Sequence, residues 1–406
     1  MTRERKNSIV GMRDGGSYLI PFILVTSLFF LWGFAHSILD VLNKHFQDVL
    51  VISKGRSGLV QAVVYGGYFL MALPAGKIME RFGYRVGVVV GLLLYGIGAL
   101  MFIPGGRLMS FEFFLLSLFV IGCGLTCLET AANPYVTVLG EKESAARRLN
   151  LAQSFNGFGW ICGPLVGSLL VLGEEGSSVS LPYAVIGVVV LCVAVLFSRV
   201  RLPEIESCAD ETTDVAERPL FSYKHFVFGV VALFFYVAAQ TGINSFFINY
   251  AVEEVSGLSA KSAGLMLSFG GMGLFVVGRM LGSWVMQYIS AVRLLTVCAV
   301  GAVLTMALVV CRLNEVSMAA LFLCYLFESV MFPTIFAIAI KGVGRHTKRA
   351  SSYLIMSIVG GAVAPVVMGV IGDRYDMATG FVVPLFCFVV ILAYCLFMRR
   401  RQGIFR

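Results

Sequence analysis

Long apolar runs follow one another from end to end of the chain, separated by short polar segments. Each run covers about 18 to 28 residues, and a helix needs about 20 apolar residues to cross the hydrocarbon core of a bilayer. The pattern predicts twelve membrane-spanning helices, which cover residues 19–43, 56–80, 84–104, 110–138, 148–172, 180–199, 224–251, 259–287, 292–312, 316–342, 349–372 and 378–398.

One extended hydrophilic stretch interrupts this pattern inside the chain, at residues 201–221. It is the predicted cytoplasmic linker between two six-helix halves, residues 1–200 and 222–406. The first apolar run follows a polar, basic segment and lacks a small-residue cleavage site. We therefore expect it to be a membrane-spanning helix rather than a signal peptide.

Two strings of the first half recur in the second half at nearly the same offset. LWGFAHSILD (31–40) aligns with FYVAAQTGIN (235–244), and LETAANP (128–134) aligns with FESVMFP (327–333). The second alignment sets Glu129 against Glu328, each with a proline five residues on. Parallel six-helix repeats resemble the architecture of major facilitator transporters, whose substrate site lies at the midplane between the halves. We therefore expect an all-α membrane protein of two pseudo-symmetric halves.

The distribution of charge gives an orientation. Charged residues make up 13% of the chain, against about 25% in soluble domains. Lys77, Lys341 and Arg345 fall in loops on the side that collects most basic residues, whereas Arg374 is one of few on the other side. The positive-inside rule then predicts that both termini are cytoplasmic. The net charge of +8 follows from this bias, so no nucleic-acid partner is needed, and the chain is expected in the inner (cytoplasmic) membrane.

Three acids lie well inside predicted helices: Asp40, Glu129 and Glu328. An ionised carboxylate at the bilayer centre costs at least about 2.5–3.5 kcal/mol, so each needs a partner, a wet cavity or a proton. We expect all three to take part in proton coupling. The alternatives are an ion pair for Glu129, a position near the outer surface for Asp40, and a hydrogen-bonded structural role for Glu328.

Polar side chains recur at helical spacing beside these acids and predict a polar cavity. A cavity of amides, carboxylates and tyrosines without clustered Arg or Lys suits a neutral polyhydroxyl ligand such as a sugar. A hydrogen bond between helices explains any single amide, and His36 could bind substrate, relay protons or only pack. The candidate substrate-binding residues are Asp40, His36, Gln61, Tyr65, Tyr68, Asn133, Gln153, Asn156, Gln240 and Asn244.

A second group of residues is predicted to control gating. The segment GKIMERFGYR (76–85) resembles the cytoplasmic loop signature of major facilitators, and its Glu80, Arg81 and Arg85 are expected to latch the halves. Arg279 in GRMLG (278–282) is the one basic residue inside a helix that could meet an anion, and we expect a structural or gating role. GWICGPLVG (159–167) is similar to an element of drug–proton antiporters, although close helix packing also explains its glycines.

Longer strings resemble the fucose permease branch of sugar–proton symporters. They include SLFFLWGFAHSILD (27–40), CLETAANPYVTVLG (127–140) and RLNLAQSFNGFG (148–159). The resemblance implies that the helix-one and helix-four acids, here Asp40 and Glu129, serve sugar binding and proton coupling. This chain departs from the pattern at His36, Ser37 and Leu39, where the permease has asparagines, and at Glu328, where it has no acid.

The expected function is proton-coupled uptake of a monosaccharide, such as L-fucose or a related hexose, by alternating access. Proton-driven efflux of drugs or sugars and a non-transporting sugar sensor remain alternatives. No HExxH or GxSxG motif and no metal-ligand spacing occurs, so no enzyme is predicted. The expected partners are the sugar and the lipid bilayer, the only coupling species is the proton, no cofactor is expected, and the expected oligomeric state is a monomer.

Overall fold

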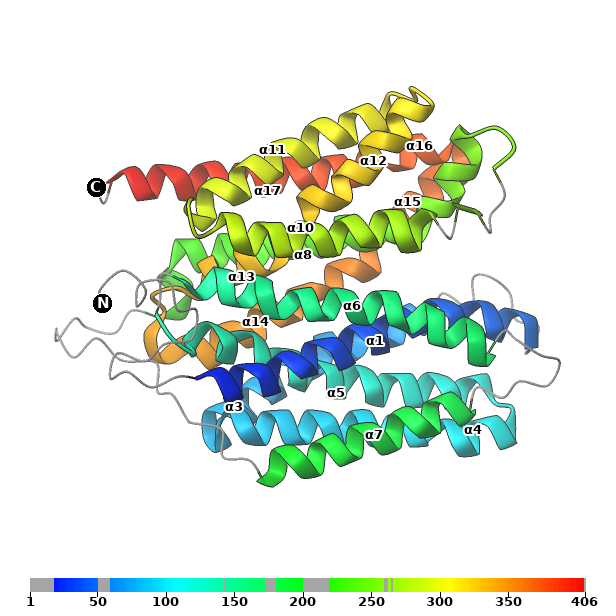
Figure 1. The fold of residues 1–406 in the computed structure, drawn as a ribbon, viewed down its shortest axis with the longest axis vertical. Coiled ribbons are helices and arrows are strands. Elements are labelled where there is room, and N and C mark those ends of the chain that lie inside the picture. The colour runs from blue at the N-terminus through cyan, green and yellow to red at the C-terminus, as the bar shows by residue number, and fades with distance from the viewer. Residues whose placement is uncertain are drawn as a thin grey trace.

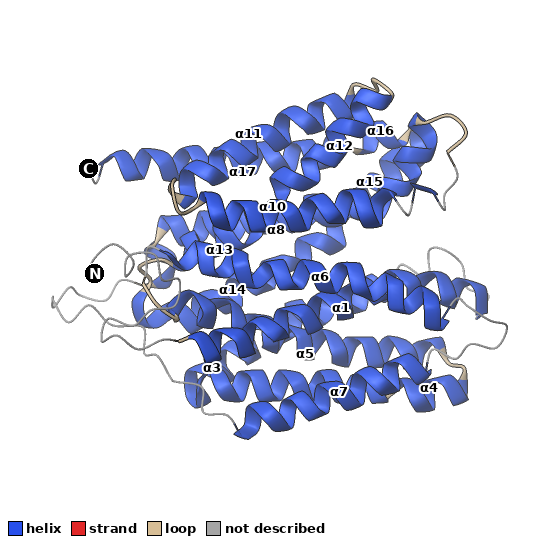
Figure 2. Ribbon diagram, in the orientation of Figure 1, coloured by secondary structure: helices blue, strands red, loops and turns tan. Residues whose placement is uncertain are grey.

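A computed structural model describes residues 18–49, 59–141, 144–171, 180–199, 219–258, 262–263 and 266–404. The described residues form helices and short connections, without strands (Figure 2). The helices run roughly alongside one another, most of those from the first half of the sequence on one side of the bundle and most of those from the second half on the other (Figure 1). The predicted all-helical architecture is therefore confirmed. The predicted linker falls almost wholly on residues outside the described ranges.

The N-terminal half contains α1 (Leu19–Val49), α3 (Leu59–Leu100), α4 (Phe102–Leu108), α5 (Phe111–Val138), α6 (Ala145–Val171) and α7 (Ser180–Arg199). The C-terminal half contains η3 (Leu220–Ser222), α8 (Lys224–Glu254), η4 (Met266–Gly271), α10 (Met272–Val285), α11 (Ala291–Val310), α12 (Glu315–Glu328), α13 (Met331–Ile340), η5 (Gly344–His346), α14 (Thr347–Met356), η6 (Ser357–Val359), α15 (Gly360–Arg374), α16 (Met377–Gly380) and α17 (Val382–Ile404).

Ten helical segments of the described chain are long and apolar enough to cross a membrane. One of them, Leu59–Leu108, has 50 residues and is broken at Gly83, where φ is 83° and ψ is 172°. A positive φ is readily adopted only by glycine, so Gly83 makes the turn between two predicted spans. Helix α6, with 27 residues, matches a further predicted span. These features agree with the predicted helix pattern, while the count of twelve stays a prediction.

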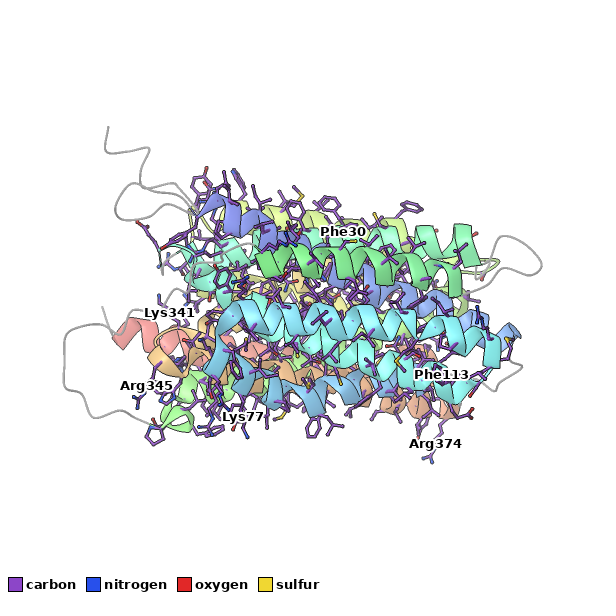
Figure 3. All side chains as sticks on the ribbon, turned by 90° about the horizontal axis from the view of Figure 1, so that it is seen from below. Phe30, Lys77, Phe113, Lys341, Arg345 and Arg374 are labelled. Carbon is purple, nitrogen blue, oxygen red and sulfur yellow. The ribbon has the colours of Figure 1, made fainter. Side chains whose placement is uncertain are left out.

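The start of α1 and the end of α17 lie at the same end of the bundle (Figure 1). Lys77, Lys341 and Arg345 gather at one end of the molecule, and Arg374 lies toward the other (Figure 3). We call the end that carries Lys77, Lys341 and Arg345 the basic end. Its basic residues come from both halves, as the charge bias predicted, and its identity as the cytoplasmic side remains a prediction.

The two aligned helices of the repeat differ in continuity. Helix α5 runs unbroken through Pro134. In the other half, α12 ends at Glu328, and α13 begins at Met331 with Pro333 in its first turn. Backbone N–H groups in the first turn of a helix have no partner within the helix, so a proline there, which lacks the N–H, removes no hydrogen bond. The predicted helix over 316–342 is therefore two helices that meet directly after Glu328.

Candidate functional site

Glu129 lies at the centre of a buried polar network in the N-terminal half. It is 1% exposed on α5, and its Oε1 accepts a hydrogen bond from Nδ2 of Asn133, one turn along the helix, at 3.5 Å. Asn133 in turn accepts from Nε2 of Gln153 on α6 at 3.1 Å. Through Asn133, the carboxyl is thus connected to a side chain of the neighbouring helix α6.

Arg279 extends this network into the other half. It is 4% exposed on α10, and its Nη1 donates to the backbone oxygen of Gln153 at 2.6 Å, to its Oε1 at 3.1 Å and to Oδ1 of Asn156 at 3.3 Å. Its Nε donates to the backbone oxygen of Ser329 at 3.0 Å. A single guanidinium therefore joins two predicted sugar-binding amides of one half to the break between α12 and α13 in the other.

An aromatic group flanks Glu129 on the side of α1. Nε2 of His36 lies 3.0 Å from the Tyr68 hydroxyl. The His36 ring stacks on Trp160 with centroids 6.0 Å apart and 16° between planes, and it meets Trp32 edge-on at 6.3 Å. Sequence analysis did not select Trp32 or Trp160. The sequence could have pointed to them, because both are tryptophans inside predicted helices, and a buried indole N–H usually needs a hydrogen-bond partner.

The remaining candidates divide between the halves. The Tyr65 hydroxyl lies 3.2 Å from Oγ1 of Thr241 on α8. Oδ1 of Asn244 accepts from the Tyr325 hydroxyl at 2.9 Å within the C-terminal half. Gln61 and Gln240 are partly exposed on α3 and α8. Tyr65 is therefore the member of this set whose described contact crosses between halves.

Asp40 lies on α1, one turn beyond His36, and its side chain lies outside the described residues. Glu328 is described fully and is 1% exposed. Neither of its carboxyl oxygens has a hydrogen-bond partner among the described residues. The charge of Arg279 acts on it, as it does on Glu129. The two repeat-related acids therefore share one cation, although only Glu129 is hydrogen-bonded.

Contacts between the halves close the basic end. Oγ of Ser351 on α14 donates to the backbone oxygen of Thr130 at 2.9 Å, and Nδ2 of Asn150 donates to Oγ1 of Thr334 at 3.1 Å. Nζ of Lys348 lies 5.0 Å from the centre of the Tyr84 ring. The described structure is thus closed on the side where α1 begins and α17 ends.

The residues predicted to gate from the loop signature lie at this same end. Glu80 and Arg81 are exposed. Arg85 donates to the backbone oxygens of Phe197 and Ser198 at the end of α7. These described bonds of Arg85 stay within the N-terminal half, and the latch between halves uses Lys348, Ser351 and Asn150 instead. A gating role for Glu80, Arg81 and Arg85 stays a prediction.

Two structural features hold the helices of the site in place: the hydrogen bonds of Arg148 and the close packing of α6 on α1. Arg148, fully buried, donates to the backbone oxygens of Val136 and Thr137 at 3.0 and 2.6 Å, and so satisfies carbonyls at the end of α5. A side chain at Gly159 or Gly163 would collide with α1. Close helix packing therefore accounts for Gly159 and Gly163 of GWICGPLVG.

The site combines a buried acid that can bind a proton, amides from both halves and aromatic rings. Such a set can hold a neutral polar molecule, with amides bonding hydroxyl groups and rings covering apolar faces. The bonds of Arg279 cross between halves, so a change of charge on either acid acts directly on the contact that holds the halves together. The arrangement therefore brings two buried acids close to a contact between the halves.

Comparison with known proteins agrees with this picture. A profile of the Major Facilitator Superfamily matches residues 21–356. The L-fucose-proton symporter of Escherichia coli (strain K12) is 38% identical over 420 residues, covering 95% of each chain. A glucose/galactose transporter of Brucella abortus biovar 1 (strain 9-941) is 35% identical over 387 residues, covering 93% of this chain and 94% of the relative.

Solved structures give the same relation. The transporter FucP in the outward conformation matches with a TM-score of 0.82 and 36% identity, over 94% of this chain and 99% of FucP. The proton:xylose symporter XylE matches with a TM-score of 0.73 over 93% and 94% of the two chains, and at 14% identity it supports the fold alone.

Proposed function

The chain belongs to the major facilitator superfamily, in its fucose permease-like branch, and we propose that it carries a monosaccharide across the membrane together with a proton. The observation that carries the proposal is the buried chain of hydrogen bonds Glu129–Asn133–Gln153–Arg279. It joins the acid that we propose to bind the proton, two amides that we propose to bind the sugar, and a contact between the halves.

The proposed cycle starts from the conformation with the basic end closed. Glu129 takes up a proton from the opposite side, which removes a charge that would be costly in a drying cavity. The sugar binds to amides and rings from both halves and competes with Arg279 for Gln153 and Asn156. The halves then rock, and Glu129 releases its proton on the basic side.

The substrate class follows from the lining of the site. Amides and tyrosine hydroxyls supply donors and acceptors for a polyhydroxyl ring, and Arg279 is occupied by bonds to Gln153, Asn156 and Ser329. L-fucose, D-glucose and D-galactose are therefore the first sugars to test. The proposed sugar contacts are Asp40, Gln61, Tyr65, Asn133, Gln153, Asn156, Gln240 and Asn244.

We place the protein in the inner membrane as a monomer, with the basic end in the cytoplasm. The bias of basic residues toward that end supports this orientation (Figure 3). We propose uptake rather than efflux because GWICGPLVG is the one feature that resembled exporters, and two of its glycines, Gly159 and Gly163, are accounted for by packing against α1.

The decisive experiment uses proteoliposomes with an imposed proton gradient, acidic outside. Wild-type protein is expected to accumulate labelled sugar, with a capacity of about tenfold per pH unit for each proton carried, since one pH unit is worth about 1.4 kcal/mol. Glu129→Gln should still exchange labelled for unlabelled sugar without a gradient, but should not accumulate it. Accumulation by Glu129→Gln, or gradient-driven loss of sugar from the vesicles, would refute the proposal.

A further inference from the structure

We propose that Trp160 on α6 covers the apolar face of the bound sugar and makes the carrier prefer sugars of the galactose configuration. This inference rests on the proposed function, and it adds a residue that selects among sugars. Trp160 lies on the inner side of its helix, level with a polar side chain of the other half. Its ring is backed by the ring of His36, with centroids 6.0 Å apart.

The helical period places Trp160 opposite the lipid-facing side of α6. Phe155 and Phe158 are 44% and 41% exposed and mark the side that faces lipid, whereas Gln153 bonds Arg279 of the other half. At about 100° per residue, Trp160 lies about 170° around the helix from the midpoint of the two phenylalanines and about 20° from Gln153. Trp160 is nevertheless partly exposed. Its exposed part therefore faces a space inside the bundle.

His36 has the corresponding position on α1. Ile20 and Ile23 are 71% and 56% exposed and mark the lipid side of that helix. His36 lies about 170° around the helix from their midpoint and is also partly exposed. Its Nε2 lies 3.0 Å from the Tyr68 hydroxyl, and its ring is inclined by 16° to the plane of Trp160. The imidazole therefore lies along the indole and limits the rotation of the Trp160 ring.

A polar side chain of the C-terminal half lies at the same level along the bundle. Helices α1, α6 and α8 begin at the basic end (Figure 1). From those starts, His36, Trp160 and Gln240 lie about 26, 22 and 24 Å along their helices. Gln240 is partly exposed and lies about 180° around α8 from Val231, which is 42% exposed and marks the lipid side. The indole of one half and the carboxamide of the other therefore border the interior of the bundle at one level.

An indole face in this position favours one class of sugar. A pyranose ring packs its C–H groups against an aromatic face, and the apolar area that this contact buries stabilises the complex. In D-galactose and L-fucose the hydrogens on the third, fourth and fifth carbons lie on one face of the ring. In D-glucose the hydrogen on the fourth carbon points to the opposite face. The first two sugars therefore present a larger continuous apolar surface to Trp160, while their hydroxyl groups remain available to amides such as Gln153 and Gln240.

The test measures the Kd of purified protein for D-galactose, L-fucose and D-glucose by titration calorimetry. Wild-type protein should bind the first two more tightly than D-glucose. Trp160→Leu keeps an apolar side chain but removes the flat ring. We expect its Kd for D-galactose and L-fucose to rise about tenfold and its Kd for D-glucose to rise only about twofold. Phe158→Leu makes a similar change on the lipid side of the same helix, and this control should keep all three constants.

Two further variants separate contact with the sugar from packing of the helices. Trp160→Tyr restores a flat ring and should recover most of the preference for D-galactose over D-glucose. His36→Asn removes the ring behind the indole and should reduce this preference less than Trp160→Leu does. Tryptophan emission gives a second measurement. The change in emission on adding saturating D-galactose should persist in Trp284→Phe, whose tryptophan is 55% exposed, and should be much smaller in Trp160→Tyr.

Three results would overturn the role of Trp160. They are an equal rise of Kd for all three sugars in Trp160→Leu, a wild type that does not prefer D-galactose to D-glucose, and a full emission change in Trp160→Tyr. A wild type that binds and transports none of the three sugars would instead overturn the proposed function itself.

Discussion

Glu129 and Glu328 occupy matching positions in the two halves of the repeat, yet their surroundings differ. Glu129 lies within a continuous α5 and is hydrogen-bonded to Asn133. Glu328 ends α12 at a helix break, and both of its oxygens lack a hydrogen-bond partner among the described residues. Both acids are buried, and both interact electrostatically with Arg279. The difference teaches that burial alone does not make two acids equivalent, because only Glu129 is connected to the contact between halves.

Among the described residues the oxygens of Glu328 have no hydrogen-bond partner, which argues against the hydrogen-bonded structural role that the sequence left open. A buried carboxylate without hydrogen bonds is costly, so we propose that Glu328 carries a proton in this conformation and is a second coupling acid. The positive charge of Arg279 would then neutralise the negative charge of only one ionised acid at a time.

The largest expected effect separates these two acids. Glu129→Gln should abolish concentrative uptake, because the proton-binding member of the network is lost. Glu328→Gln should still concentrate sugar, but with one proton per sugar instead of two. Across a gradient of two pH units the limiting accumulation would fall from about 10,000-fold to about 100-fold. Steady-state uptake at several gradients measures this slope, and an unchanged slope in Glu328→Gln would show that Glu328 does not carry a coupling proton.

A smaller effect, on stability rather than on coupling, tests what stabilises the end of α5. Arg148 is fully buried and satisfies carbonyls at the end of α5. Arg148→Ala leaves these carbonyls without donors. The free energy of unfolding should therefore fall by on the order of 3 kcal/mol, since a hydrogen bond to a charged group contributes about 1.5–3 kcal/mol. Thermal unfolding of purified protein measures the change. A melting temperature equal to that of the wild type would contradict this role.

The smallest effect is expected at the exposed part of an ion-pair cluster in the C-terminal half. The Arg312 side chain is 49% exposed, and its Nε and Nη1 lie 2.8 Å from the buried Glu254 and 3.0 Å from Asp376, which is 32% exposed. Exposed ion pairs contribute little, so Asp376→Asn, which leaves Arg312 paired with Glu254, should shift the melting temperature near pH 7 by less than roughly a quarter of the Arg148→Ala shift. An equal or larger shift would show that this cluster, too, holds the fold.

The pH dependence of this cluster has a defined sign. The backbone N–H and the hydroxyl of Thr379 donate to Asp376 and lower its pKa. The stabilisation from Asp376 is therefore complete above the ordinary aspartate pKa of about 4 and is lost as the pH falls through the lower pKa of the folded state. Asp376→Asn should remove this part of the acid sensitivity, with thermal unfolding between pH 3 and pH 6 as the measurement.

The sequence by itself determined the helical pattern, the two halves and the buried acids. Apolar runs long enough to cross a bilayer allow few structures other than helices, because backbone groups must be satisfied within the segment. The repeat found Glu129 and Glu328 as a pair, and the amides Asn133, Gln153 and Asn156 followed from their helical spacing. All of these features depend on the local order of residues, which a single sequence records.

Only the tertiary structure decided which of these residues meet. Arg279 is 123 residues from Asn156, and His36 is 32 residues from Tyr68, so no local pattern could pair them. The break after Glu328 and the buried place of Arg148 also depended on what packs around them. Residue type and helical period determine which side chains face inward, whereas the packing of one helix against another determines their partners. That packing is what separates the connected acid from the unconnected one.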